Sequence, residues 1–165
     1  MLRPRREGDL ERCVSLLREV YEADRYPAIW PPDTLGWLAG RDSLAAWVAE
    51  EEERLFGHLS LHATDASRAR PQWCAALGVG VERLAVVSRF FVSPEARGRG
   101  IGGDLIARAE EHAARHGLRL VLDVAAHNRD AIAFYERRGW QRAGTTVLSL
   151  SGEPWTLPVV LFVLP

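Results

Sequence analysis

Lysine is absent from this chain, and all 21 of its basic residues are arginine. A Walker-type phosphate loop and a Schiff-base catalyst both require a lysine amine, so both classes are excluded. The 22 acidic residues bring the formal net charge to −1. Such a balance gives no general attraction to nucleic acid or to a membrane surface, so we expect neither as a partner. The exclusive use of arginine favours a bacterial source with a GC-rich genome.

Cysteine is also scarce, with only Cys13 and Cys74 far apart in the sequence. This excludes a disulfide framework and a CxxC zinc site. His112 and His116 lie four residues apart in an expected helix, but Ala113 stands where a zinc-binding HExxH motif has glutamate. We therefore expect no metal and interpret the two histidines as part of a solvated helix face.

Long hydrophobic runs are missing. No run of 18 apolar residues exists, and the charged start MLRPRREGDL is not followed by an apolar segment, so we expect neither a membrane helix nor a signal peptide. A cytoplasmic protein is the resulting prediction. The length of 165 residues, with 47% hydrophobic and 26% charged residues, predicts one globular domain over residues 1–165.

Hydrophobic periodicity and turn signals predict an alternating set of strands and helices. The expected strands cover residues 2–4, 43–50, 55–62, 83–92, 118–124, 141–150 and 156–164. The expected helices cover residues 9–22, 33–39, 100–116 and 129–138, with a further helical turn at 73–77 inside the long connection 63–81.

A glycine-rich turn joins one expected strand to the following helix, in the segment S-P-E-A-R-G-R-G-I-G-G of residues 93–103. Glycines permit positive φ and close approach of a ligand to the backbone. The unpaired amides of a helix N-terminus favour an anion, and Arg97 and Arg99 add positive charge. The turn therefore predicts a phosphate or pyrophosphate site.

A dinucleotide site is the first alternative, because Gly98, Gly100 and Gly103 spell GxGxxG and Asp123 follows about twenty residues later at a strand. Placement argues against it. Five residues separate the strand from the first glycine, and too few βα units follow the turn to build a dinucleotide fold.

The same turn resembles motif A of the GNAT superfamily of N-acetyltransferases, whose signature is R/Q-x-x-G-x-G/A, because residues 97–102 read R-G-R-G-I-G. Residues 128–140 resemble the family's segment N-x-x-A-x-x-[FY]-Y-x-x-x-G-[FW]. The resemblance implies an α/β fold with a mixed, mostly antiparallel central sheet flanked by helices. The sheet would be splayed between the parallel strands 83–92 and 118–124, where the cofactor enters.

The resemblance also implies the co-substrate, acetyl-CoA, with no metal. The preceding strand would bind the pantetheine arm through its backbone, and one of its amides would polarise the thioester carbonyl. The loop would bind the pyrophosphate. The implied cofactor-binding residues are Phe90, Phe91, Val92, Arg97, Gly98, Arg99, Gly100, Ile101, Gly102, Gly103 and Asn128. Asn128 is equally readable as a plain helix cap.

Tyr135 matches the family tyrosine that protonates the departing thiolate, and Asp123 stands where some relatives carry a proton-accepting glutamate. Asp123 could instead hold a loop or pair with Arg119 on the same strand face. Glu82, His127 and a water relay also remain open as the base.

Direct transfer of acetyl to a primary amine in a ternary complex is the implied reaction, on a small-molecule or peptide acceptor. A non-catalytic acyl-CoA-binding module is the alternative. The resemblance implies that residues 21–30 and 63–81 wall the acceptor pocket, and their aromatic and acidic side chains would either line it or pack the loops. These side chains are Glu22, Asp24, Tyr26, Trp30 and Trp73. Homodimerisation through the final strands is compatible with the pattern.

Overall fold

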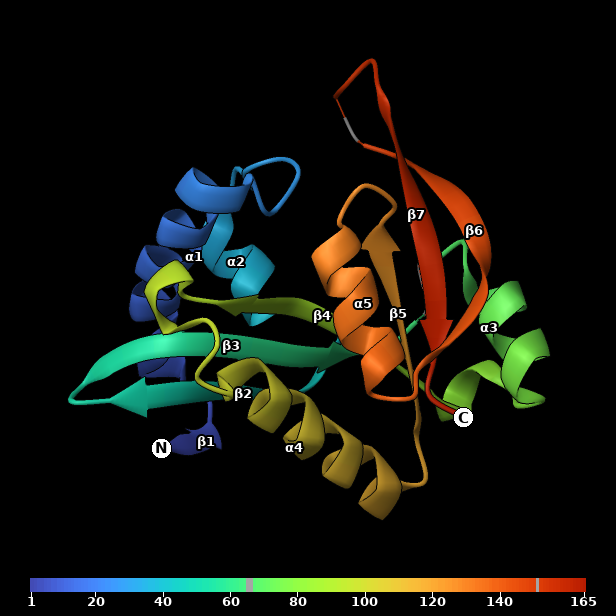
Figure 1. Cartoon of the computed structure of the whole chain (residues 1–165), viewed down its shortest axis with the longest axis horizontal. Helices are drawn as coiled ribbons and strands as arrows, with labels where there is room; N and C mark the ends of the chain where they lie inside the picture. The colour runs from blue at the N-terminus through green and yellow to red at the C-terminus, as the bar shows by residue number, and fades with distance from the viewer. Residues whose placement is uncertain (65–66, 151) are drawn as a thin grey trace. The chain divides into compact units, whose positions relative to one another are not determined.

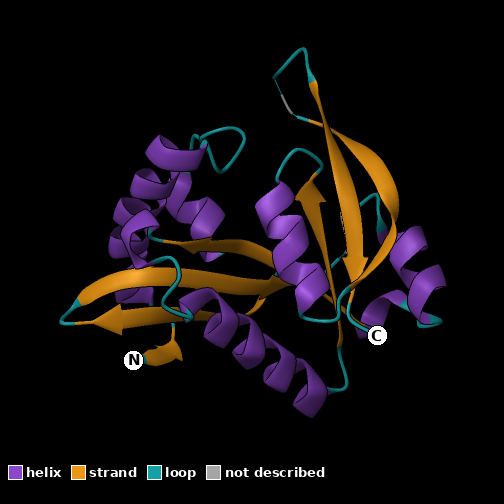
Figure 2. Ribbon diagram, in the orientation of Figure 1, coloured by secondary structure: helices purple, strands orange, loops and turns teal. Residues whose placement is uncertain are grey.

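The computed structural model describes residues 1–64, 67–150 and 152–165. Its strands are β1 (Leu2–Pro4), β2 (Ser43–Glu51), β3 (Arg54–His62), β4 (Leu84–Val92), β5 (Arg119–Ala125), β6 (Gln141–Ser149) and β7 (Thr156–Val163). Its α-helices are α1 (Leu10–Asp24), α2 (Thr34–Ala39), α3 (Arg70–Leu77), α4 (Ile101–His116) and α5 (Arg129–Arg137). Figure 1 traces them along the chain, and Figure 2 separates helices from strands.

The strand order is β1-β2-β3-β4-β5-β7-β6, which gives the expected mixed sheet. Strands β1–β2, β2–β3, β5–β7 and β6–β7 pair antiparallel, whereas β4 and β5 are parallel. The parallel pairing covers only Leu84–Val86 against Arg119–Val121, and both strands continue beyond it. The predicted α/β fold, with a mixed, mostly antiparallel sheet that contains one parallel strand pair, is confirmed.

The chain forms two compact units, and β4 runs through both. Unit 1 contains Met1–His62 and Val87–His112, and unit 2 contains Ala63–Val86 and Ala113–Pro165. Whether the whole chain behaves as the one predicted domain stays a prediction. None of the described helices is long and apolar enough to cross a membrane.

Unit 1 is a strand layer covered by helices on both faces. One face packs against α1 and α2 through a core of Cys13, Leu16, Leu17, Val20, Leu38, Val48, Leu55 and Phe91. On the other face a Cβ placed on Gly57 would lie 2.8 Å from Leu105 of α4, so glycine lets the helix approach β3 closely. His112 of α4 also meets Trp47 of β2 edge-on at 5.2 Å, so this histidine packs on the sheet rather than only facing solvent.

Unit 2 is likewise covered on both faces, by α3 and α5 (Figure 2). The α3 face holds a buried cluster of Ala69, Trp73, Leu84, Val121, Val159, Leu161 and Val163. The α5 face receives Phe162, whose ring lies 5.9 Å from that of Tyr135. Successive side chains of β7 therefore point alternately toward α3 and toward α5.

Candidate functional site

The glycine-rich turn lies in unit 1 and is fixed at its base by a buried serine. Ser93, which has no exposed surface, donates its backbone N–H to the Phe56 carbonyl at 2.8 Å and its hydroxyl to Glu19 at 3.2 Å. A short 3-10 turn, Pro94–Ala96, follows, and α4 then begins at Ile101. The turn thus leaves β4 from a defined point and delivers its glycines to the N-terminus of a 16-residue helix.

Two glycines of the turn need the left-handed conformation. Gly98 has φ +77° and Gly100 has φ +84°, and a Cβ added at either position would meet no atom within 4 Å. The strain on any other residue would therefore come from the backbone alone. The space over the loop is open, and the first amides of α4 have no acceptor within the helix. This combination suits a negatively charged group.

Both arginines of the turn are held by acidic side chains of unit 1. Arg97 forms an ion pair with Asp24 at the end of α1. Arg99 forms one with Glu51 at 2.7 Å, and its guanidinium lies 5.4 Å above the Phe56 ring. Asp24, expected as a contact for a cationic amine, therefore orients Arg97. The carboxylates are about half exposed, so each of these ion pairs contributes little net free energy and its replacement by another anion costs little.

The last residues of β4 point alternately to the two faces of the strand layer. Phe91 is buried in the α1 face, where its ring stacks on His58 at 5.0 Å and meets Tyr26 at 6.3 Å. Phe90 and Val92 are only partly buried. The difference in burial leaves the backbone groups of this segment as the candidates for a ligand contact.

The second group of predicted residues lies in unit 2, around β5 and α5. Asn128 caps α5, as expected, by accepting a hydrogen bond from the Ala131 amide at 3.1 Å. Tyr135 is buried, with Phe134 at 5.2 Å, Trp140 at 5.5 Å and Phe162 at 5.9 Å between ring centroids. The Tyr135 ring is thus packed among three other aromatic rings of unit 2.

Asp123 lies on the other face of the unit 2 sheet. It pairs across the strands with Leu161, a member of the α3 cluster, whereas Leu122 pairs with Phe162 on the Tyr135 side. The carboxylate is solvent-exposed, yet desolvation by the surrounding protein raises its pKa. Among the described residues no ion pair with Arg119 forms, because that guanidinium donates to the Leu164 carbonyl at 3.5 Å. The plain Arg119–Asp123 pair is thus not found.

The other candidate bases occupy exposed turns of unit 2. Glu82 belongs to the 3-10 turn Val81–Arg83 before β4, and His127 belongs to the turn between β5 and α5. Both are solvent-exposed. Asp123, Glu82 and His127 thus all lie in unit 2 with exposed side chains.

The aromatic residues expected around an acceptor divide into two kinds. Tyr26 and Trp30 pack on the unit 1 core, and Trp30 also meets Tyr21 edge-on at 5.3 Å. Trp73 has no exposed surface and fills the unit 2 core, so its expected alternative role in packing is the one found. Its helix, α3, is longer than the predicted turn at 73–77.

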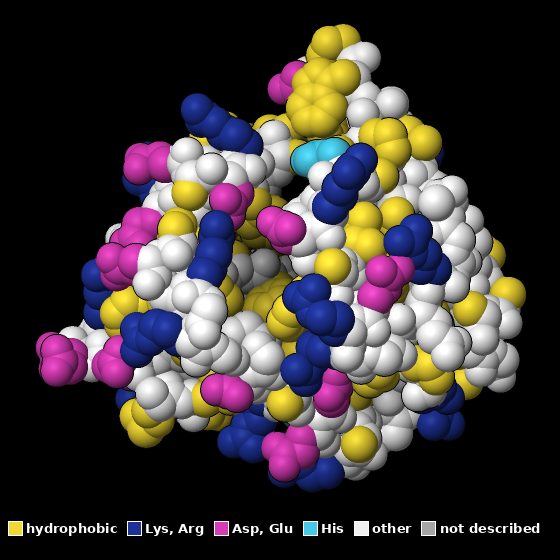
Figure 3. All heavy atoms as spheres, in the orientation of Figure 1, with side chains coloured by type: hydrophobic (Ala, Val, Ile, Leu, Met, Phe, Trp, Pro, Cys, Tyr) yellow, Lys and Arg dark blue, Asp and Glu magenta, His cyan; other side chains and the backbone are white. Residues whose placement is uncertain are grey.

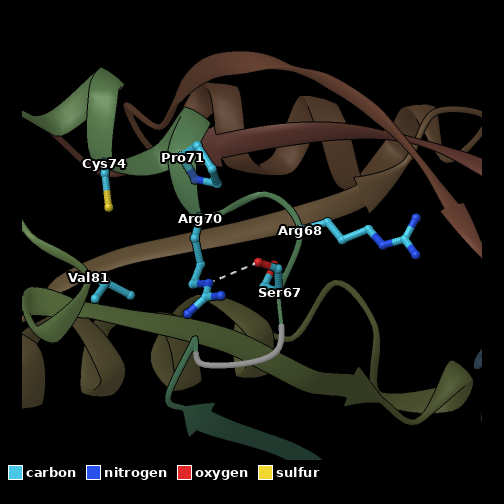
Figure 4. Close-up of a pocket in the computed structure, with 6 residues that line it drawn as sticks. All are labelled: Ser67, Arg68, Arg70, Pro71, Cys74 and Val81. Atoms are coloured by element: carbon cyan, nitrogen blue, oxygen red, sulfur yellow. Dashed lines mark hydrogen bonds between the residues drawn. The ribbon is translucent and has the colours of Figure 1, made fainter.

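A cavity of about 410 Å³ lies beside α3 in unit 2, lined by Ser67, Arg68, Arg70, Pro71, Cys74 and Val81 (Figure 4). Arg70 Nε donates to the Ser67 carbonyl at 3.2 Å there, whereas Arg68 extends away from the other labelled residues. None of the predicted catalytic or cofactor-binding residues lines this cavity. A smaller cavity of about 180 Å³ in unit 1 does include Arg99 and Ile101 of the turn.

Sequence reasoning missed a row of polar side chains on β3. His58, Ser60 and His62 alternate along the strand and are all buried in unit 1. They face Arg89 of β4, a non-glycine residue with φ +48°. Alternating polar residues in an otherwise apolar strand were the available signal, because period two puts them on one face.

Comparison with known proteins supports this description. The model of the acetyltransferase (GNAT) family matches residues 10–140. An uncharacterised N-acetyltransferase of Methanocaldococcus jannaschii is 31% identical over 140 residues, which are 82% of this chain and 58% of the relative. The chain thus spans somewhat more than half the length of that relative.

Two solved structures share the fold at low identity. An N-acetyltransferase from Staphylococcus aureus Mu50 superimposes with a TM-score of 0.73 at 20% identity, covering 99% of this chain and 96% of the other. Arabidopsis thaliana NAA60 in complex with acetyl-CoA gives 0.72 at 21% identity, covering 99% and 95%. On the family match and the archaeal relative together, the chain belongs to the acetyltransferase (GNAT) family.

Proposed function

We propose that this protein is an N-acetyltransferase that transfers acetyl from acetyl-CoA to a primary amine. The observation that carries the proposal is the turn after β4. In it Gly98 and Gly100 have a left-handed backbone with no atom within 4 Å of the Cβ position, and the first amides of α4, which have no acceptor within the helix, follow them. A solved relative of the same fold binds acetyl-CoA. The pyrophosphate would accept hydrogen bonds from the residues 97–103, and the pantetheine arm would follow Phe90–Val92.

The chemical step is direct attack of the amine on the thioester. The nitrogen forms a bond to the acetyl carbon, the carbon–sulfur bond breaks, and Tyr135 donates a proton to the departing thiolate. Asp123 is the proposed proton acceptor for the amine, since its raised pKa makes it a better base than an ordinary carboxylate. Asn128 would contact the cofactor arm while it caps α5.

A covalent acyl-enzyme is not part of the proposal. Cys13 is completely buried in the unit 1 core, and burial raises the pKa of its thiol to about 12. Its thiolate is therefore negligible at neutral pH, which removes it as a nucleophile. The proposal further includes a cytoplasmic, bacterial setting, supported by the two unpaired cysteines and the arginine-only composition.

Replacement of the proposed acid provides the test. In the Tyr135→Phe variant we expect turnover to fall by about 10²-fold or more, because a positioned general acid contributes about that factor. CoA release and acetylated amine are measured together by chromatography and mass spectrometry. The thermal shift caused by acetyl-CoA should remain, since the phenol is not assigned to cofactor binding. Unchanged turnover would remove Tyr135 as the acid, and a wild-type protein that binds acetyl-CoA without any turnover of a broad amine panel would be a binding module.

A further inference from the structure

Unit 1 contains a group of buried and partly buried basic and polar side chains that the proposed chemistry does not use. We name it the Arg89 cluster, and its members are Arg5, Trp37, His58, Ser60, His62 and Arg89. Arg89 Nη1 donates to His62 Nε2 at 2.5 Å, and its guanidinium lies 4.9 Å from the centre of the Trp37 ring. Ser60 Oγ lies 2.8 Å from the same His62 nitrogen and donates to the Ser88 carbonyl at 3.1 Å.

The two histidines of the cluster are neutral. His62 accepts from Arg89, and His58 Nε2 faces Arg5 Nη1 at 3.1 Å while its Nδ1 donates to the Arg89 carbonyl at 2.7 Å. A ring nitrogen that accepts from a guanidinium carries no proton. Desolvation also lowers the pKa of His58 to about 3 and that of His62 to about 4. The two histidines thus add no positive charge to the cluster, and they do not neutralise the charges of Arg5 and Arg89.

The cluster therefore carries the positive charge of two arginines, and neither arginine has a carboxylate partner among residues 1–64, 67–150 and 152–165. Arg5 donates to the Leu38 and Ala39 carbonyls, and Arg89 to His62. In contrast, other arginines of this unit pair with carboxylates, such as Arg3 with Asp9 at 2.7 Å. For Arg89 the charges that favour its protonated form are those of Tyr26 and Asp42, and Asp42 forms no ion pair with it among the described residues. A partly buried, unbalanced cation pair favours binding of an anion.

Arg89 offers a defined set of donors for that anion. Its Nε is buried and has no hydrogen-bond partner among the described residues. The Nε and Nη2 protons of a guanidinium point the same way and match the two oxygens of a carboxylate. Nη1 is occupied by His62, and Trp37 supports one flat face of the group. The remaining edge of the guanidinium is the one formed by Nε and Nη2, which can donate two parallel hydrogen bonds to a carboxylate.

The position of Arg89 relates this anion site to the reaction. Arg89 immediately precedes Phe90–Val92, the segment to which the proposed function assigns the thioester arm. An acceptor amine must reach that thioester, so a group attached to the acceptor a few atoms from its amine would come near Arg89. We infer that Arg89 binds a carboxylate of the acceptor, and that the acceptor is a small amino-carboxylate such as a free amino acid. This inference depends on the proposed function.

The test compares matched acceptors with and without the carboxylate. The wild-type protein is assayed with the common amino acids, with their carboxamides and with the corresponding decarboxylated amines. We expect one or more acids to exceed the matched neutral compounds by about ten-fold or more in kcat/KM, because a hydrogen bond to a charged group contributes about that factor. In Arg89→Gln that preference should vanish, mainly through a higher KM for the acids, whereas turnover of neutral amines should persist. Arg89→Lys should restore only part of it, since lysine lacks the bidentate edge.

Two controls make the result decisive. Arg108→Gln removes an exposed arginine of α4 that pairs with Glu111, and it should leave the preference unchanged. The acetyl-CoA thermal shift of Arg89→Gln shows whether the variant is folded and binds the cofactor. Equal or better use of the neutral compounds by the wild type overturns the inference, as does an acid preference that survives in Arg89→Gln. If no acid is acetylated and none raises the melting midpoint of the acetyl-CoA-saturated protein, the inference is also overturned. Absence of any acetyl-CoA shift in the wild type would contradict the proposed function itself.

Discussion

At the scale of single residues, the neutral histidines of unit 1 determine how the protein responds to mild acid. His58 has no exposed surface, and desolvation lowers its pKa to about 3 from an ordinary value of 6.5. Its two ring nitrogens hold Arg5 and the backbone of Arg89. Protonation would place a third positive charge beside two arginines, which explains why the folded state resists it.

The free energy of unfolding should therefore fall as the pH decreases below 6.5. Between pH 6.5 and the pKa of His58 in the folded state, the unfolded chain binds a proton on this ring and the folded chain does not. The contribution of the neutral His58 to the free energy of unfolding is therefore fully present above pH 6.5 and is lost as the pH falls through this range. His58 alone should account for about 2 kcal/mol between pH 6.5 and 5. Urea denaturation at a series of pH values measures this slope. The carboxylates with lowered pKa, such as Glu50 at about 2, contribute only at lower pH.

The variant His58→Asn should have a shallower pH dependence over this window, because its side chain does not titrate. It is also expected to be less stable at pH 7, since asparagine cannot reach both partners. The matched control is His127→Asn, which replaces an exposed histidine of unit 2 and should keep the wild-type slope. A slope in His58→Asn equal to that of the wild type would contradict the assignment.

At the scale of elements, most boundaries follow from local signals in the sequence. Apart from α3, which begins three residues before the expected turn at 73–77, the expected helices and strands lie within two residues of those found, because periodicity marks their cores and caps mark their ends. Asp33 accepts from the Gly36 amide at the start of α2, and Asn128 does the same for α5. The turn after β4 could also be predicted from the sequence, because a backbone with φ > 0 requires glycine at the positions where it occurs.

Features that depend on distant residues could not be predicted in this way. The left-handed Arg89 in β4 has its carbonyl held by His58 of β3, 31 residues away in sequence. The ion pair of Arg97 with Asp24 and the burial of Trp73 also depend on tertiary contacts. Propensity and spacing carry no information on such partners. The glycine-rich turn and the alternating polar residues of β3 could therefore be predicted from the sequence, whereas the contacts of these residues with Arg89 could not.

The turn itself leads to a prediction about one glycine. In Gly100→Ala the left-handed backbone should reduce stability by about 1 to 2 kcal/mol, because Cβ is disfavoured at φ +84°. The added methyl group would enter the open space over the loop, so affinity for acetyl-CoA should fall by about ten-fold or more, as when a close backbone contact is lost. Isothermal titration calorimetry measures the affinity.

Gly78→Ala is the matched control for that variant. Gly78 caps α3 in unit 2 with φ +65°, and a Cβ there would likewise meet no atom within 4 Å. The strain should be similar, but acetyl-CoA affinity should not change. Equal loss of affinity in both variants would show that instability, rather than the loop, is responsible.

At the scale of the whole molecule, charge is balanced and recognition must be local. The formal net charge is −1, and Figure 3 shows arginine and acidic side chains interspersed over one face. Under the proposed function, affinity for the anionic co-substrate would therefore come from the amides and arginines of the turn rather than from an overall field. Because the family match extends over residues 10–140, it includes parts of both units.

The most direct test of the acetyl-CoA site is a thermal melt with acetyl-CoA, CoA and NAD in parallel. A ligand that binds only the folded state at a hundred times its Kd adds about 2.7 kcal/mol, which should raise the midpoint by about 5 to 10 °C for a chain of this size. NAD is the matched control because it also carries a pyrophosphate. We predict that acetyl-CoA and CoA raise the midpoint and that NAD does not. A shift with NAD alone, or no shift with any of the three, would contradict the assignment of the turn to acetyl-CoA.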